Sequence, residues 1–422
     1  MPRPRPPSRI DIIPSPLFGI CWYANPGTGE SIVAYCGGGG SAATGVKNIV
    51  GIRIPGTDTV EISTGDQVGV AITIVQNPIS NQLHLFVALG NKVNRYRLPD
   101  GQPTGSLEVG DNINAITVNA MVDQLAVGCE DGSVKVYKVT DDKMESDPVY
   151  NCDGHQKAVC ALAFSPREQI LVSSAKDGTA RVWKQGQSLG VLKCSVADPR
   201  APPPTRAVQV LVRGCAFGDL NGKLIYTIAS GRRGKAYLSK WGFNAASKKY
   251  ECMERTECSP CPISAMSLSG DAGLLALGAV DGTIILWGVD RWKPLKLFRE
   301  VHDLPVTCIA ARPFPLPLQG EEDGVQFHAL SASADSQLAW LSLQRPQKSK
   351  ASSRGSGSLK GTVNSLVRIM ILGWILYPVA NEIWEKCEED WDNVGYAKTW
   401  ECIRYDALLA PTSRPGILVP PH

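Results

Sequence analysis

The sequence predicts an all-β fold, a closed propeller of seven four-stranded blades, followed by a C-terminal single-pass transmembrane helix. Three observations support this prediction. Hairpins centred on an Asp-Gly turn recur at spacings that fit propeller blades. Seven apolar segments lie where the inner strands of such blades begin. Near the C-terminus, an apolar segment separates a basic stretch from an acidic one.

The hairpins are clearest in three stretches and weaker in a fourth: LAVGCEDGSVKVYKV (125–139), LVSSAKDGTARVWKQ (171–185), LALGAVDGTIILWGV (275–289) and ALSASADSQLAWLSL (329–343). Asp-Gly tolerates the positive φ angles of tight two-residue turns, and the flanking residues alternate or are β-branched. Asp131 and Asp177 are 46 residues apart, and Asp281 follows Asp177 by 104. Propeller blades of about 40–45 residues fit these intervals, with one further blade in the longer interval.

The expected inner strands share an apolar, β-prone composition: ICWYA, AITIV, INAITV, VCALAFS, VQVLV, ISAMSLS and VTCIAA. Counting one blade for each gives seven blades over residues 18–343, preceded by an N-terminal arm over residues 1–17. A propeller closes on itself and so protects its strand edges.

One polar set is expected to hold the fourth blade together. His155, Asp177 and Trp183 resemble the histidine, turn aspartate and tryptophan that cross-link the blades of WD-type propellers, and His302 is a candidate for the same role in the seventh blade. Buried polar groups need partners, so we interpret this set as structural. No nucleophile and base arrangement or carboxylate pair predicts an active site.

The composition narrows the kinds of partner and binding site that are expected. Lys+Arg 43 against Asp+Glu 40 gives a net charge of +3, too balanced for a nucleic-acid partner to be expected. The arginines of the MPRPRPPSR terminus are interpreted as solvated. The 13 cysteines lie mostly in apolar runs, which is typical of reduced, buried thiols. Cys258 and Cys261 form one Cys-x-x-Cys without a second pair, so we expect no zinc site.

The C-terminal part is predicted to anchor the chain in a membrane. Residues 344–362 are a basic flexible linker, and residues 363–383 are long enough to cross a bilayer if Arg368 and Glu382 lie at its interfaces. Basic residues precede this segment and acidic residues follow it, so we expect a cytosolic propeller and a short lumenal tail over residues 384–422, where Cys387 and Cys402 can pair. A surface helix or a docked core helix is the alternative.

A run of four glycines interrupts the first predicted blade, in CGGGGSAATGVKNIV (36–50). It is not a P-loop, because Val46 follows Gly45 where a lysine is required, and Asn48 stands in place of a hydroxyl. The run lies between the second and third strands of the blade, where other blades have a two-residue turn. We therefore expect residues 37–48 to form an exposed loop at one rim of the propeller.

The pattern G-G-G-G-x-x-x-[ST]-G-x-x-N in the first blade of a membrane-tethered WD-type propeller resembles the family of the prolactin regulatory element-binding protein and its yeast secretory counterpart. Members of this family are endoplasmic reticulum guanine-nucleotide exchange factors. They act without covalent chemistry on the Sar-type small GTPase that starts assembly of coat protein complex II. The resemblance covers propeller, linker and anchor.

The resemblance implies that the loop is ordered around a potassium ion and engages the switch regions of the GTPase. Asn48 is implied as the residue that promotes exchange and is expected to project from the loop, outside the blade core. The residues implied to shape the loop or to contact the GTPase are Gly37, Gly38, Gly39, Gly40, Thr44, Gly45, Lys47 and Ile49. Ala43 departs from the family, where a basic residue is expected. A flexible insertion without a role, or a non-catalytic scaffold that assists cargo exit, is the alternative.

Overall fold

The computed structural model describes residues 7–343 except 8, 142, 197–208 and 314–325. The chain divides into two units, residues 1–346 and 347–422, and every described residue belongs to the first. The predicted linker, transmembrane helix and lumenal tail lie outside the described residues. Among the residues that are described, no helix is long and apolar enough to cross a membrane.

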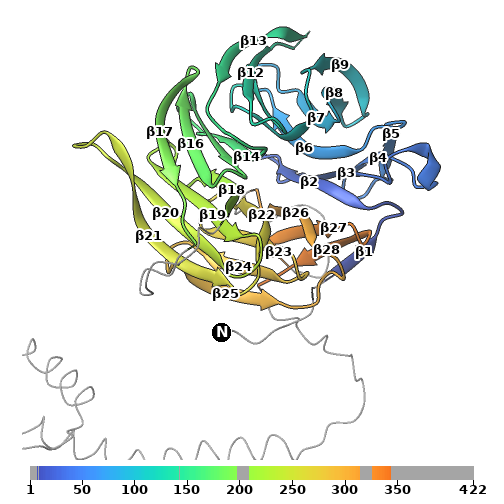
Figure 1. The fold of residues 1–422 in the computed structure, drawn as a ribbon. Helices are drawn as coiled ribbons and strands as arrows, with labels where there is room; N and C mark the ends of the chain where they lie inside the picture. The colour runs from blue at the N-terminus through green and yellow to red at the C-terminus, as the bar shows by residue number, and fades with distance from the viewer. Residues whose placement is uncertain (1–6, 8, 142, 197–208, 314–325, 344–422) are drawn as a thin grey trace, which may run out of the picture. The chain divides into compact units, whose positions relative to one another are not determined.

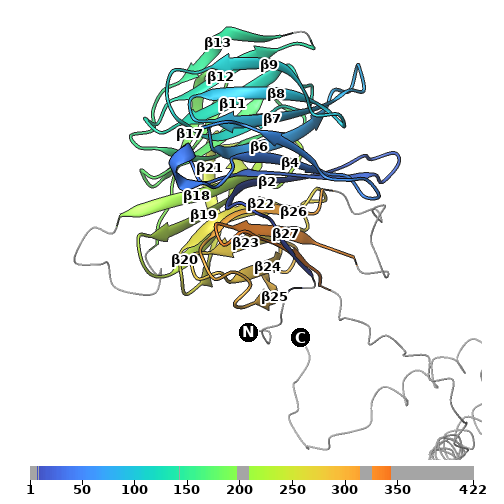
Figure 2. The same ribbon diagram turned by 90° about the vertical axis from the view of Figure 1, so that its right-hand side faces the viewer.

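Seven antiparallel sheets of four strands surround a common axis, as Figures 1 and 2 show, and the predicted all-β, seven-bladed propeller is confirmed. The first four blades, from inner to outer strand, contain β2 (Leu17–Ala24), β3 (Ser31–Gly37), β4 (Ile49–Arg53), β5 (Val60–Ser63); β6 (Gly69–Gln76), β7 (Leu83–Leu89), β8 (Lys92–Leu98), β9 (Gln102–Glu108); β10 (Ile113–Val118), β11 (Gln124–Cys129), β12 (Val134–Val139), β13 (Met144–Cys152); and β14 (Val159–Phe164), β15 (Ile170–Ala175), β16 (Thr179–Lys184), β17 (Gln187–Lys193).

The last three blades contain β18 (Val210–Phe217), β19 (Leu224–Gly231), β20 (Ala236–Asn244), β21 (Lys249–Ser259); β22 (Ile263–Leu268), β23 (Leu274–Ala279), β24 (Ile284–Gly288), β25 (Lys293–Phe298); and β26 (Val306–Ala311), β27 (Ala329–Ser333), β28 (Gln337–Leu341), β1 (Arg9–Ile12). The expected inner strands coincide with β2, β6, β10, β14, β22 and β26. The fifth, VQVLV, begins two residues later than expected, at Val210.

The seventh blade takes its outermost strand from the N-terminus. β1 pairs antiparallel with β28, so that Arg9 lies opposite Trp340. Asp11 Oδ2 accepts hydrogen bonds from Trp340 Nε1 at 2.8 Å and from Arg53 Nη1 of the first blade at 2.5 Å. The sequence analysis had assigned residues 1–17 to a separate N-terminal arm. Arg9–Ile12 instead belong to the propeller and close the ring.

Apolar side chains fill the spaces between neighbouring blades. One buried cluster joins Ala34 and Val50 of the first blade to Leu85 and Val87 of the second. Another joins Trp22 of the first blade to residues of the seventh. Each blade thus buries its faces against both neighbours, and the ring offers a rigid frame for the turns at its two rims.

Candidate functional site

The glycine run forms the connection between β3 and β4, residues 38–48, and contains the 3-10 turn η1 (Ala42–Thr44). The corresponding connection in the fourth blade, between β15 and β16, has three residues, 176–178. Because all blades have the same strand order, these connections lie on one face of the propeller, which we call the loop face. Figure 2 shows the connection in blue at the left-hand side of the ring.

The base of this loop is locked onto the chain that enters the first blade. The backbone N–H of Gly38 donates to Pro16 O at 2.9 Å, and Ser15 Oγ donates to Lys47 O at 2.9 Å. Gly37 and Gly38 are buried. A Cβ at Gly38 would overlap Asn48 Oδ1, so only glycine allows this close approach. The two ends of the loop are therefore held from outside the loop.

Asn48 is buried, with 4% of its surface exposed, and its amide joins three backbone groups. Asn48 Oδ1 accepts from the N–H of Gly40 at 3.0 Å. Asn48 Nδ2 donates to Gly40 O at 2.6 Å and to Gly65 O at 2.8 Å. Both amide protons and the amide oxygen are thus in use. The expectation that Asn48 projects from the loop is wrong, because its side chain points inward and fixes the loop.

The tip of the loop is the exposed part. Ser41, Thr44, Gly45 and Lys47 are exposed, and Gly40 turns the chain with a φ of 87°. Ser41 O accepts from both the backbone N–H of Thr44 at 3.1 Å and its Oγ1 at 3.0 Å, which closes the turn. Residues 41–47 can therefore reach a partner, whereas the whole run of 37–48 had been expected to be exposed.

Ile49 also departs from expectation. It is 4% exposed, lies in β4 and belongs to the buried cluster between the first and seventh blades. Its side chain packs in the propeller core and does not offer an apolar contact at the surface. The implied GTPase-contacting set is thereby divided into buried members at the base and exposed members at the tip.

A potassium site built on Asn48 does not fit this arrangement. The amide nitrogen of Asn48 lies between Gly40 O and Gly65 O, at 2.6 and 2.8 Å, where a cation bound by both carbonyls would lie. Asn48 Oδ1 faces an N–H donor. The hydrogen bonds of the Asn48 amide therefore hold this part of the loop, and a potassium ion bound by other carbonyls of residues 37–48 stays a prediction.

The fourth blade brings its polar set together as the sequence indicates. His155 Nδ1 lies 2.9 Å from Asp177 Oδ2, and His155 Nε2 lies 2.8 Å from Ser173 Oγ. Trp183 Nε1 donates to the same Ser173 Oγ at 2.8 Å, and Thr179 Oγ1 donates to Asp177 Oδ1 at 2.8 Å. His155 and Asp177 have side chains only 0% and 7% exposed. The set supports the blade and is closed to a substrate.

A family model of the WD domain with G-beta repeat matches residues 146–184, which run from β13 to β16 and include this polar set. The chain is a WD40-repeat protein.

Curated relatives of this WD40-repeat protein match parts of it. WD repeat and HMG-box DNA-binding protein 1 of Mus musculus is 27% identical over 202 residues, 47% of this chain and 17% of that protein. Angio-associated migratory cell protein of Homo sapiens is 23% identical over 210 residues, 47% of this chain and 41% of that protein. SEC12-like protein 2 of Arabidopsis thaliana is 24% identical over 208 residues, 49% of this chain and 48% of that protein. The match covers less than half the length of each relative.

Two other features of this WD40-repeat protein do not form sites. Asp111, Cys129 and Asp131 bring ligand atoms within 4.8 Å of one another. Asp111 Oδ2 accepts from the N–H of Asp131, and Asp131 Oδ1 accepts from Ser133 N–H, so both carboxylates serve the turn. Burial raises the pKa of the Cys129 thiol, which keeps it protonated.

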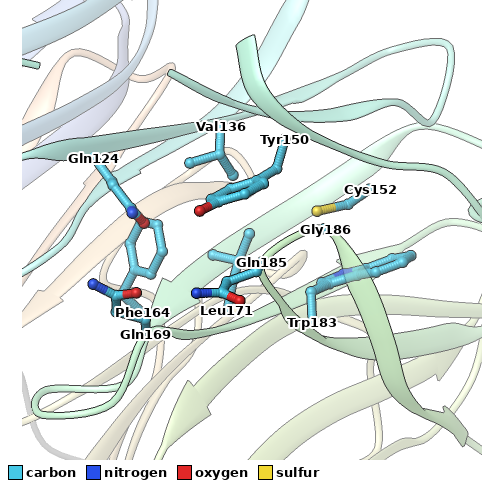
Figure 3. A pocket seen from close by; sticks show the side chains of 10 residues that line it. All are labelled: Gln124, Val136, Tyr150, Cys152, Phe164, Gln169, Leu171, Trp183, Gln185 and Gly186. Atoms are coloured by element: carbon cyan, nitrogen blue, oxygen red, sulfur yellow. The ribbon is translucent and has the colours of Figure 1, made fainter. Parts of the chain in front are cut away.

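A hollow between the third and fourth blades is small. Figure 3 shows Trp183 beside Cys152, with Tyr150 and three glutamines around the opening. Its volume is about 10 Å³, room for about one water molecule. It is a seam between packed sheets and is too small for a ligand.

Sequence reasoning missed the partners of the loop. Gly65 lies 17 residues after Asn48, and Ser15 lies 32 residues before Lys47. Neither carries a local pattern that marks it as a loop contact.

Proposed function

We propose that this WD40-repeat protein is a guanine-nucleotide exchange factor for a Sar-type small GTPase and acts through the loop at 38–48. The observation that carries the proposal is the loop itself. It replaces a three-residue turn by eleven residues, its base is fixed by Asn48, Pro16 and Ser15, and its tip is exposed. The partial similarity to SEC12-like protein 2 of Arabidopsis thaliana supports the same assignment.

The proposed mechanism uses binding energy and no covalent chemistry. An exchange factor accelerates GDP release only if it binds the nucleotide-free GTPase more tightly than the GDP-bound form. A loop that is already ordered loses less conformational entropy when it inserts into the switch regions. In this proposal residues 41–47 contact the GTPase, with Thr44 and Lys47 as polar contacts, and Asn48 is a positioning residue that keeps the tip in its inserting conformation.

The place of action proposed is the endoplasmic reticulum membrane, where assembly of coat protein complex II begins. The helix at 363–383 would hold the protein there, with the propeller in the cytosol and residues 384–422 in the lumen. Carbonate washing of microsomes should leave the chain in the pellet, and protease added outside sealed microsomes should spare the tail. Release by carbonate, or digestion of the tail, contradicts the anchor and leaves the exchange proposal standing.

The deciding experiment measures release of fluorescent GDP from a Sar-type GTPase, with and without the full-length chain. We expect the chain to accelerate release by at least about tenfold, which corresponds to about 1.4 kcal/mol of barrier. In a variant, residues 38–48 are replaced by Lys-Asp-Gly, the turn of the fourth blade. This variant should release GDP at the spontaneous rate.

The matched control changes the equivalent turn of the second blade, Gly90 and Asn91, to Asp-Gly and should retain full acceleration. If the loop-replacement variant accelerates GDP release as much as the unmodified chain does, another surface of the protein drives exchange. If the unmodified chain gives no acceleration at all, the scaffold that assists cargo exit without exchange becomes the better assignment.

A further inference from the structure

A second turn on the loop face is joined to the loop of the first blade. It is the connection between β5 and β6, residues 64–68. Asn48 Nδ2 donates to Gly65 O at 2.8 Å, and the backbone N–H of Thr64 donates to Asn48 O at 3.1 Å. The same amide nitrogen donates to Gly40 O inside the loop at 2.6 Å. Asn48 therefore fixes the loop and this turn relative to each other.

The turn at 64–68 is also closed by bonds of its own. The N–H of Gln67 donates to Thr64 O at 3.3 Å, and Thr64 Oγ1 donates to Gln67 O at 2.6 Å. Gly65 has a φ of 63°, which glycine adopts without strain and which tight turns require. Asp66 lies at the corner of this turn and is exposed. Its carboxylate is thus held at the surface by a backbone that is already fixed.

Asp66 lacks the structural role of its counterparts in other blades. In the connection that enters the third blade, the residue after the glycine is Asp111, whose Oδ2 accepts from the N–H of Asp131 at 3.0 Å. In the connection that enters the fourth blade it is His155, whose Nδ1 lies 2.9 Å from Asp177 Oδ2. Asp66 makes no hydrogen bond or ion pair with any residue that the structure describes. Its carboxylate is therefore available to a partner.

Charge on this surface is divided between the loop and the turn. Lys47 is the single charged residue of the sequence 38–48, and Asp66 is the single charged residue of the sequence 64–68. Both are exposed. A partner that fits the two together offers an acidic group to the lysine and a cationic group to the aspartate.

The nucleotide site of a small GTPase contains such a cationic group. Its P-loop lysine and a magnesium ion neutralise the phosphates of the bound nucleotide. When GDP and magnesium leave, the lysine loses its anionic partners. A carboxylate from outside can then restore part of this pairing, and it can do so only after the phosphates have left. Such a contact stabilises the nucleotide-free form selectively, which is the differential binding that exchange requires.

We propose that Asp66 is a second functional residue of the exchange surface, and that its carboxylate pairs with the P-loop lysine of the GTPase once GDP has left. Residues 41–47 engage the switch regions, and the turn at 64–68 faces the phosphate site beside them. This proposal rests on the exchange function proposed above. It adds the contact that distinguishes the nucleotide-free GTPase from the GDP-bound form.

The test measures release of fluorescent GDP from a Sar-type GTPase over a range of concentrations of the full-length chain. Asp66→Asn removes the charge and keeps the size of an exposed side chain, so the fold should stay intact. The maximal rate of release should fall at least about tenfold, while the chain concentration at half-maximal rate should change by less than about threefold. The reason is that the lysine is still paired with GDP when the complex forms. Asp66→Glu should restore part of the maximal rate.

The matched control is Glu61→Gln. Glu61 is an exposed carboxylate on β5 of the same blade, and its loss should leave both the maximal rate and the half-maximal concentration unchanged. Melting temperatures identify any variant that fails to fold.

Binding provides a readout that a purely structural role of Asp66 would not produce. Asp66→Asn should weaken binding to the nucleotide-free GTPase at least about tenfold and leave binding to the GDP-bound form unchanged. In a double-mutant cycle, a GTPase whose P-loop lysine is changed to methionine should bind the unmodified chain and the Asp66→Asn chain equally.

The outcomes separate this proposal from the exchange function. If the unmodified chain accelerates release and a folded Asp66→Asn chain does so equally, only the role of Asp66 is overturned. Equal weakening of binding to both GTPase forms, or a full effect of Asp66→Asn on the lysine variant of the GTPase, overturns the pairing with the lysine. If the unmodified chain gives no acceleration, the exchange function fails and this proposal fails with it.

Discussion

The connection between the second and third strands is built in two different ways in the fourth and first blades. In the fourth blade it has three residues, and Asp177 is tied to His155, Thr179 and the backbone of Gln156. In the first blade it has eleven residues, and the side chain of Asn48 joins Gly40 in its interior to Gly65 outside it. The same position in the fold thus serves a structural turn in one blade and an exposed surface in another.

The difference lies in how the stabilising contacts are shared. Burial raises the pKa of Asp177, but hydrogen bonds from His155, Thr179 and two backbone N–H groups outweigh it and hold the pKa well below its usual range. The ionised carboxylate is therefore strongly favoured in the folded state. The amide of Asn48 is neutral and bonds only to backbone. We therefore expect the Asp177 network to stabilise the whole fourth blade, and the Asn48 amide to stabilise only the loop of the first blade.

The largest expected effect is that of Asp177→Ala. It leaves His155 Nδ1 and the N–H groups of Gln156 and Thr179 without their acceptor, and we expect the free energy of unfolding to fall by roughly 3 kcal/mol. Urea denaturation checks this. The matched control is Asp131→Ala in the third blade, where the turn aspartate is exposed and the cost should be about 1 kcal/mol or less. Equal losses in the two variants would show that the histidine network adds nothing.

Asn48→Ala should have the second largest effect, and a local one. It removes the acceptor of the Gly40 N–H and both donors to Gly40 O and Gly65 O, at a cost of roughly 2 kcal/mol. Hydrogen exchange should show lost protection at Gly40 while the amides of the fourth blade stay protected. If the loop tip acts on a Sar-type GTPase as proposed, release of GDP should slow by at least about tenfold, because the tip is no longer held in place.

The control for this prediction is Asn91→Ala, which removes a turn asparagine whose amide bonds to the exposed Glu108. It should change stability by no more than about 0.5 kcal/mol. If Asn48→Ala keeps Gly40 protected and yet slows exchange, then Asn48 acts on the GTPase directly. If exchange and protection are both unchanged, the amide does not hold the loop.

Much of the fold was predictable because its signals are local. Asp-Gly turns such as Asp177 and Gly178, and apolar strands before them, repeat within each blade and can be counted. The place of the glycine run between two strands follows from the same count. The polar set of the fourth blade follows from residue types within one repeat.

What could not be predicted depends on pairings between distant residues. Arg9 pairs with Trp340, which lies near the opposite end of the propeller sequence. The four-residue strand β1 has no alternation of apolar and polar residues strong enough to predict this pairing. The burial of Asn48 depends on Gly65, and residues flanking Asn48, such as the exposed Lys47, gave no sign of it. A β-bulge such as that at Arg213 is a register shift, which composition does not encode.

The seventh blade contains a histidine network like that of the fourth, and its dependence on the charge of the histidine can be tested. His302 bonds to Asp335 and Ser331, as His155 does to Asp177 and Ser173, but Leu341 stands at the position of Trp183. Burial lowers the pKa of His302, against the opposing effect of Asp335 and Asp303.

A histidine whose pKa is lowered on folding binds fewer protons in the folded state, so the stability it contributes is complete above its unfolded pKa of about 6.5 and is lost as the pH falls below that value. The free energy of unfolding should therefore decline from pH 7 to pH 5, and His302→Gln should flatten this decline. Above pH 7 the free energies of unfolding of the unmodified chain and of the His302→Gln variant should change with pH in parallel. An equally steep decline in the variant would assign the loss to other groups, with His84, whose pKa is also lowered by burial, as the next candidate.

The smallest expected change in stability is that of Lys47→Ala, and it separates the tip of the loop from its base. The side chain of Lys47 is exposed, whereas its backbone carbonyl accepts from Ser15, a bond that alanine keeps. The free energy of unfolding should therefore change by less than about 0.5 kcal/mol, and Gly40 should keep its protection from exchange. If the tip contacts the GTPase, release of GDP should still slow, by about threefold, because a charge contact at an interface rim is worth under about 1 kcal/mol. The same change made at Lys92, at the start of the third strand in the second blade, should leave release unchanged. If the Lys47→Ala variant has normal stability and normal exchange, the side chain of Lys47 does not contact the GTPase. The contact is then made by Thr44 and by the backbone of the tip.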